Sequence, residues 1–230
     1  MSYKMIWFDF GGVLSPPINQ LFDIYQSRTG IPSNVLKDVM NKVAADMGLE
    51  MLSPIENALI TETEWGSLLR SKLNSEYPCV DSSMARLEFF GEQWFSNITP
   101  NTMMINEFLR LKELGYSVGI LTNNVIEWEP YWKAMLNLGN TPDFIVDSCK
   151  EKRRKPEPEF FYLAEKRSGF LPNESLLVDD LKVNCDAALQ RGWGAVHFKD
   201  THSALNELRE LLTSRTMNEH RTPESALSNQ

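Results

Sequence analysis

The 230-residue sequence has few cysteines, no long apolar run and no excess of positive charge. Its three cysteines lie far apart without Cys-x-x-Cys spacing, which argues against a disulfide framework or a zinc site. The formal net charge of -8 argues against a broad surface for nucleic acid or anionic lipid. An acid already at position 9 leaves no room for the apolar core of a signal peptide. We therefore expect a cytoplasmic protein that binds neither nucleic acid nor a membrane.

The first apolar run, Ile6–Phe8, ends directly in an acid, Asp9. Two glycines, Gly11 and Gly12, follow shortly afterwards, and this turn signal indicates a short buried strand of a parallel sheet. Open α/β sheets bind ligands at the carboxyl ends of their strands, so Asp9 is predicted to lie at the rim of a site. A lone acid in this position more often only begins a turn, so the prediction depends on the rest of the chain.

Residues 18–98 show helical patterns and no strand signal. Apolar residues recur at three- and four-residue spacing over 19–28 and 34–46. Thr61 and Glu64 have the spacing of a capping box, and an apolar stripe follows them. This block predicts a helical unit inserted after the first strand.

From residue 99 onward, helical patterns alternate with short apolar runs at 116–121, 143–146, 176–178 and 195–198. The alternation predicts an α/β fold: a Rossmann-like, doubly wound parallel sheet core with an inserted all-helical cap domain. Residues 1–16 and 99–214 would form the core domain, and residues 17–98 the cap above Asp9. Residues 215–230 are polar and are expected to be a disordered tail.

Polar residues stand at the ends of these strands or in the loops that follow: Thr122, Lys155 and the pair Asp179 and Asp180. Each one alone has an ordinary explanation as a helix cap, a solvated lysine or a turn. Because the carboxyl ends of parallel strands meet at one edge, we expect these groups to lie near Asp9. An acid nucleophile, a hydroxyl donor, a cation and a carboxylate pair would then form one site.

Four segments carry these residues in order along the chain: Phe8–Leu14, Leu121–Asn123, Arg154–Pro158, and Val178–Asp180 with Asn184. Together they resemble the four motifs of the haloacid dehalogenase-like hydrolase superfamily, in the branch with a helical cap after the first motif (subfamily I). The resemblance covers about residues 1–213. It implies a hydrolase, and most directly a phosphatase of a small phosphorylated metabolite over which the cap closes.

The resemblance also implies a Mg²⁺ site made by Asp9, the main-chain carbonyl of Gly11, and Asp179 or Asp180. A small hard cation with oxygen ligands suits this set. Lys155 would balance the charges of Asp9 and the phosphate from the other side.

Further implied contacts place the phosphate oxygens near Gly12, the Thr122 hydroxyl and the Asn123 amide. Attack by Asp9 would give an aspartyl phosphate, which water then hydrolyses. The sequence does not distinguish a monomer from a homodimer.

The sequence departs from the family pattern at Gly11, where phosphatases of the family usually have a second Asp that acts as general acid and base. Loss of such a group typically costs about 10²–10⁴-fold in rate. One interpretation is a phosphatase whose leaving group departs easily, such as a sugar 1-phosphate or an acyl phosphate. In a second, the cap supplies the acid through Glu50, Glu56, Glu62 or a tyrosine, and Gly11→Asp would then change activity little.

Two further interpretations remain open. The protein could be a catalytically impaired member that binds a phosphorylated ligand or a partner protein, although Asp9 and Lys155 are retained. It could also be a metal-free 2-haloacid dehalogenase, although such an enzyme has little use for the pair Asp179 and Asp180.

Overall fold

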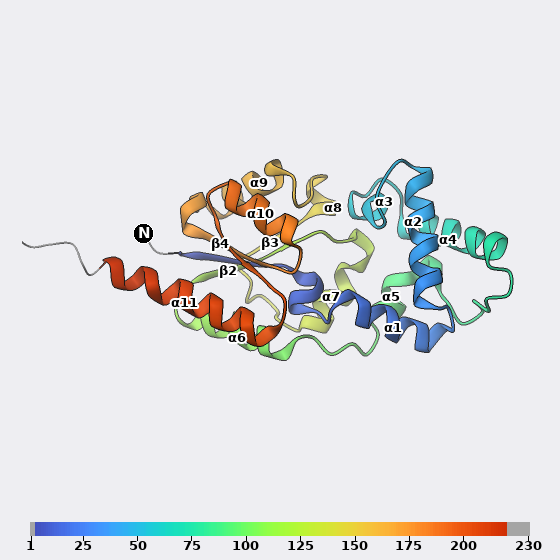
Figure 1. Cartoon of the computed structure of the whole chain (residues 1–230), viewed down its shortest axis with the longest axis horizontal. Coiled ribbons are helices and arrows are strands. Elements are labelled where there is room, and N and C mark those ends of the chain that lie inside the picture. Colours follow the sequence, from blue (N-terminus) through green and yellow to red (C-terminus); the bar gives the residue numbers. More distant parts are fainter. Residues whose placement is uncertain (1–2, 220–230) are drawn as a thin grey trace, which may run out of the picture.

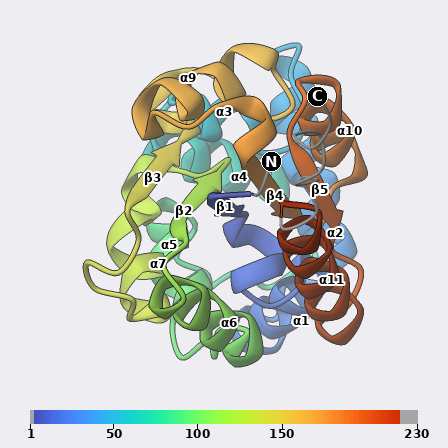
Figure 2. The ribbon, with the colours of Figure 1, turned by 90° about the vertical axis from the view of Figure 1, so that its left-hand side faces the viewer.

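A single parallel sheet forms the centre of the computed structural model, which describes residues 3–219, with side chains through residue 213. The strand order is β3-β2-β1-β4-β5, so β1 lies in the middle of the sheet (Figure 2). This order places the first strand between the two strands that end at Thr122 and Asp179. The strands are β1 (Met5–Phe8), β2 (Ser117–Thr122), β3 (Phe144–Asp147), β4 (Ser175–Asp179) and β5 (Gly194–His197).

Helices cover both faces of the sheet, as the doubly wound prediction requires (Figure 2). Alternate side chains of a strand point to opposite faces. Trp7 therefore belongs to one apolar cluster with Phe160, and Phe8 belongs to the other with Phe108. The covering helices are α6 (Thr102–Glu113) and α11 (Thr201–Glu219) on the Phe8 face, and α9 (Pro158–Ser168) and α10 (Lys182–Gln190) on the Trp7 face. Two shorter helices are α7 (Glu129–Leu136) and α8 (Ser148–Glu151).

The chain between β1 and β2 forms the predicted cap, and residues 15–101 contain helices and turns but no strand. Its helices lie beyond the carboxyl ends of the strands (Figure 1). The capping box predicted at Thr61 and Glu64 is present with both of its hydrogen bonds. The cap helices are α1 (Ile18–Thr29), α2 (Ser33–Asp46), α3 (Ser53–Glu56), α4 (Glu62–Glu76) and α5 (Phe90–Phe95).

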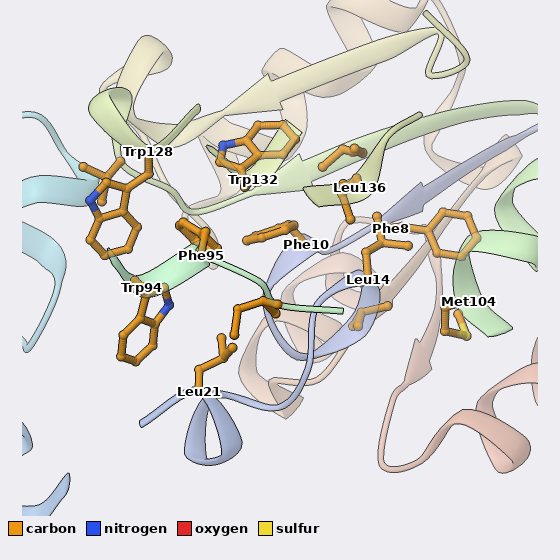
Figure 3. Packing of buried hydrophobic residues seen from close by; sticks show 14 of the residues in the cluster. Phe8, Phe10, Leu14, Leu21, Trp94, Phe95, Met104, Trp128, Trp132 and Leu136 are labelled. Atoms are coloured by element: carbon orange, nitrogen blue, oxygen red, sulfur yellow. The ribbon is translucent and has the colours of Figure 1, made fainter. Parts of the chain in front are cut away.

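Core and cap share one apolar cluster. The ring of Phe10, just after β1, lies 5.3 Å from that of Trp132 in the core and 5.8 Å from that of Phe95 in the cap (Figure 3). Buried aromatic contacts of this kind stabilise the packing of the cap on the core.

The end of the chain differs from the expectation of a tail that begins at residue 215. Helix α11 continues through Glu219, and the rest of the expected tail, residues 220–230, lies outside the described residues. Within residues 3–219, each helix is too short or too polar to cross a lipid bilayer. The exact domain boundaries stay a prediction.

Candidate active site

Asp9 and Asp179 lie side by side because they end neighbouring parallel strands. Phe8 of β1 pairs in register with Val178 of β4, so the next residue on each strand occupies the same edge. Lys155 lies between the two acids. Its Nζ atom is 2.8 Å from Asp9 Oδ1 and 2.6 Å from Asp179 Oδ2, and its side chain is fully buried.

Asp180 completes a cluster with these two acids. One carboxylate oxygen from each of Asp9, Asp179 and Asp180 lies within 4.8 Å of the others. Burial raises the pKa of Asp9 to about 8 against the opposing charge of Lys155, and the two other acids add to the increase. Burial and the charge of Asp179 raise the pKa of Asp180 to about 6. Three acids thus lie around a single buried lysine. Their carboxylate oxygens are a set of ligands that suits a hard cation.

Asp179 is held in place by its own loop and by α10. Its Oδ1 atom accepts hydrogen bonds from the Leu181 main-chain N–H and from Asn184 Nδ2, both at 2.9 Å. Oδ2 accepts from Lys155. Asn184, which belongs to the fourth motif of the sequence, therefore positions an acid of the cluster.

The two glycines after Asp9 occupy different environments. Gly12 has a φ of +72°, and a Cβ atom added there would lie 2.5 Å from Asp180 Oδ2. Its N–H donates to the Ser15 hydroxyl at 3.0 Å. Gly11 has a φ of -65°, and no atom lies within 4 Å of an added Cβ. The left-handed backbone at Gly12 and its close approach to Asp180 both favour glycine there, whereas position 11 accommodates a Cβ atom.

The second motif contacts the third through Asn123. Its side-chain Nδ2 donates to the Lys155 carbonyl at 2.9 Å, and its Oδ1 accepts from the Lys155 N–H at 2.8 Å. These two bonds hold the Lys155 backbone, so the Asn123 side chain positions Lys155. Thr122, at the end of β2, is buried with its hydroxyl 3.4 Å from the Asn123 carbonyl. Phosphate contacts of Gly12, Thr122 and Asn123 stay a prediction.

A cavity of about 110 Å³ lies between core and cap beside Gly11. Its walls are mainly apolar and include Phe10 of the core and Phe95 and Trp94 of the cap (Figure 3). Glu56 and Asn124 are among its polar lining residues. The cavity therefore joins the turn after Asp9 to side chains of the cap.

The family model of the haloacid dehalogenase-like hydrolases matches residues 3–192. The chain belongs to this family. Among curated relatives, it is 26% identical over 222 residues to bifunctional epoxide hydrolase 2 of Sus scrofa, covering 92% of this chain and 39% of that protein. It is 27% identical over 96 residues to flavin mononucleotide hydrolase 1 of Arabidopsis thaliana, covering 42% of this chain and 39% of that one. Each match thus covers about two fifths of the relative's own length.

Solved structures of the hydrolase family share the fold. A family enzyme of Bacteroides thetaiotaomicron in complex with magnesium and inorganic phosphate has a TM-score of 0.61 at 20% identity, covering 86% of this chain and 96% of that chain. L-2-haloacid dehalogenase of Xanthobacter autotrophicus has a TM-score of 0.60 at 17% identity, covering 99% of this chain and 92% of that chain. Since both of these enzymes have this fold, the fold alone does not specify the reaction. The reaction depends on the side chains of the site.

One contact of this hydrolase was not predicted from the sequence. Arg154 belongs to the basic run Lys150–Lys155, and most residues of such a charged run are usually solvated. In the structure its Nη2 atom lies 3.0 Å from Glu56 Oε2, and its Nη1 atom donates to the Ser53 hydroxyl. Arg154 thereby connects the third motif to α3 of the cap, and only its place next to Lys155 hints at this in the sequence.

Proposed function

We propose that this family member is a Mg²⁺-dependent phosphatase that acts on a small phosphorylated metabolite through an aspartyl phosphate on Asp9. The observation that carries the proposal is the cluster of Asp9, Asp179 and Asp180 around the buried Lys155. A dehalogenase that uses no metal has no need of three carboxylates with oxygens within 4.8 Å of one another. A phosphatase needs positive charge beside an attacking carboxylate, because a phosphate monoester repels it.

The hydrogen bonds of Asp9 indicate which of its oxygens attacks. Oδ1 accepts from the Phe10 N–H at 2.7 Å and lies 2.8 Å from Lys155 Nζ. Oδ2 takes part in neither contact, and we assign it as the nucleophile. Mg²⁺ held by Asp9, Asp179 or Asp180 and the Gly11 carbonyl would supply the charge that favours ionised Asp9 and offsets the phosphate.

The proposed reaction has two steps on Asp9. Attack on phosphorus breaks the bond to the leaving oxygen and gives an aspartyl phosphate, and water then releases inorganic phosphate. Lys155 keeps Asp9 oriented and offsets negative charge in both steps. A small substrate, or one with a small leaving group, matches a cavity of about 110 Å³ between core and cap.

The test is phosphate release from sugar 1-phosphates, sugar 6-phosphates, nucleotides that include flavin mononucleotide, and acetyl phosphate, with Mg²⁺ or with EDTA. We expect turnover that requires Mg²⁺ and that falls by about 10³-fold or more in Asp9→Asn. Two results would contradict the proposal and favour a binding protein: equal phosphate release by Asp9→Asn and the wild type, or no phosphate release from any compound. Halide release from a 2-haloacid in the presence of EDTA would favour a dehalogenase instead.

A further inference from the structure

The site described so far lacks a group that transfers protons to and from the substrate. When phosphorus moves to Asp9, the leaving oxygen keeps the electron pair of the broken bond and must gain a proton unless its pKa is low. When water attacks the aspartyl phosphate, a base must take a proton from that water. Gly11 has no side chain for either task, although its surroundings have room for one.

The three cap acids that are candidates for this task have different environments in the structure. Glu50 is exposed to solvent. The carboxylate of Glu62 accepts hydrogen bonds from the Gly91 N–H and from Trp128 Nε1. These bonds give Glu62 a structural role. Glu56 alone of the three lines the cavity beside Gly11.

Glu56 is held at the junction of cap and core. Its main-chain carbonyl accepts from the Ser148 hydroxyl at 2.8 Å, which fixes the end of α3 against α8. Its carboxylate lies 3.0 Å from Arg154. Burial raises the pKa of Glu56, and the charges of Arg154 and Lys155 act in the opposite direction. A buried carboxyl whose pKa is raised can hold a proton closer to neutral pH than an exposed one.

We propose that Glu56 is the general acid and base of the phosphatase, in place of the side chain that Gly11 lacks; this inference rests on the proposed function. In the first step an Asp9 oxygen forms a bond to phosphorus, the bond to the leaving oxygen breaks, and the Glu56 proton moves to that oxygen. In the second step the Glu56 carboxylate takes a proton from the attacking water. The water oxygen forms a bond to phosphorus, the phosphorus–Asp9 bond breaks, and inorganic phosphate leaves, which restores the Asp9 carboxylate and the protonated Glu56.

The test compares Glu56→Gln with the wild type on two substrates. One is p-nitrophenyl phosphate, whose leaving group departs without a proton, and the other is an alkyl phosphate turned over by the wild type. We expect kcat/KM, which reports the first step, to fall by about 10²–10⁴-fold for the alkyl phosphate and by less than about 10-fold for p-nitrophenyl phosphate. With p-nitrophenyl phosphate the variant should release one equivalent of nitrophenol rapidly and then turn over slowly, because the second step has lost its base.

A purely structural contact between Glu56 and Arg154 predicts a different result. In that case Glu56→Gln and Arg154→Met would lower kcat/KM for both substrates by the same factor, without a rapid release of nitrophenol. That result, or a Glu56→Gln protein equal to wild type on both substrates, would overturn the assignment of Glu56.

A rescue variant provides the matched control. Because no atom lies within 4 Å of a Cβ atom at position 11, Gly11→Asp can be added to Glu56→Gln without a steric conflict at its Cβ atom. We expect the double variant to recover alkyl phosphate hydrolysis by about 10-fold or more over Glu56→Gln, a partial recovery of the roughly 10²–10⁴-fold effect of a general acid. If the wild type is active and depends on Asp9, failure of these results rejects Glu56 alone. If the wild type releases no phosphate, the proposed function and the assignment of Glu56 both fail.

Discussion

The adjacent residues Gly11 and Gly12 allow a sharp test of packing at the site, since only one of them needs to be glycine. A Cβ atom at position 12 would lie 2.5 Å from Asp180 Oδ2 and would stand on a backbone with a φ of +72°. We expect Gly12→Ala to lower the free energy of unfolding by about 1–2 kcal/mol, the cost of the left-handed conformation. It should also weaken Mg²⁺ binding, because Asp180 must move away.

Gly11→Ala is the control for this variant. Its φ of -65° suits any residue, and an added Cβ meets no atom within 4 Å. We expect its unfolding free energy to stay within about 0.5 kcal/mol of the wild type. Urea denaturation gives the stabilities, and calorimetric titration gives the Mg²⁺ affinities. Equal losses in the two variants would contradict the packing of Gly12 against Asp180.

At the scale of secondary structure elements, a buried acid connects two helices on the same face of the sheet. Glu107 of α6 is 2% exposed. Its carboxylate accepts a hydrogen bond from Arg110 of α6 at 2.9 Å and from Arg209 of α11 at 2.6 Å. Burial raises the pKa of Glu107, but the hydrogen bonds and charges of Arg110 and Arg209 outweigh this effect. The pKa of Glu107 therefore lies below its ordinary value. The ionised form of Glu107 therefore stabilises the packing of α11 on α6.

We expect Glu107→Gln to lower the free energy of unfolding by about 1–2 kcal/mol at pH 7, since both arginines are half exposed and screened. The pKa is lower in the folded state, so this stabilisation is present above the unfolded value of 4.5 and is lost as the pH falls through the folded value. Urea denaturation should therefore show a difference between wild type and variant that is constant near neutral pH and shrinks below pH 4.5. Glu113→Gln, at an exposed position of the same helix, should differ from wild type by less than about 0.5 kcal/mol. A pH-independent difference in Glu107→Gln would contradict the ionic contribution.

At the scale of the whole molecule, local patterns predict the elements of the fold better than their arrangement. The run before Asp9 reads as a buried strand, and the predicted capping box at Thr61 is present, because both depend on residues within a few positions of each other. The central place of β1 in the order β3-β2-β1-β4-β5 depends on pairing between segments more than 100 residues apart. The alternation of strand and helix patterns along the chain predicts a parallel sheet but not this order.

The same difference in range explains what could be predicted of the site. The proximity of Asp9 and Asp179 follows from a general property of parallel sheets, whose carboxyl ends share one edge. The different roles of Glu50, Glu56 and Glu62 do not follow from it, because in the sequence all three are simply acids within the predicted cap segment. Their different environments depend on how the cap packs on the core, including the contact of Glu56 with Arg154. No local pattern of residues encodes that packing.

Cation binding should be visible in the stability of the whole molecule, independently of any substrate. Three acids share one buried lysine at the edge of the sheet, so a bound Mg²⁺ would interact with the folded state and not with the unfolded chain. At a Mg²⁺ concentration of 100 times the dissociation constant, this linkage stabilises a protein by about 2.7 kcal/mol. We expect Mg²⁺ to raise the Tm of the wild type measured by differential scanning calorimetry, and EDTA to reverse the increase.

Asp180→Asn is the variant that tests the origin of this shift. Its side chain keeps the shape of the acid but removes one negative charge, so Mg²⁺ should raise its Tm much less than that of the wild type. In EDTA, the variant should be as stable as the wild type or more stable, because the cluster then holds less uncompensated charge. Asp186→Asn, an acid on the surface of α10, should keep the full Mg²⁺ shift. An equal Mg²⁺ shift in wild type, Asp180→Asn and Asp179→Asn would place the cation elsewhere on the molecule and contradict the proposed metal site.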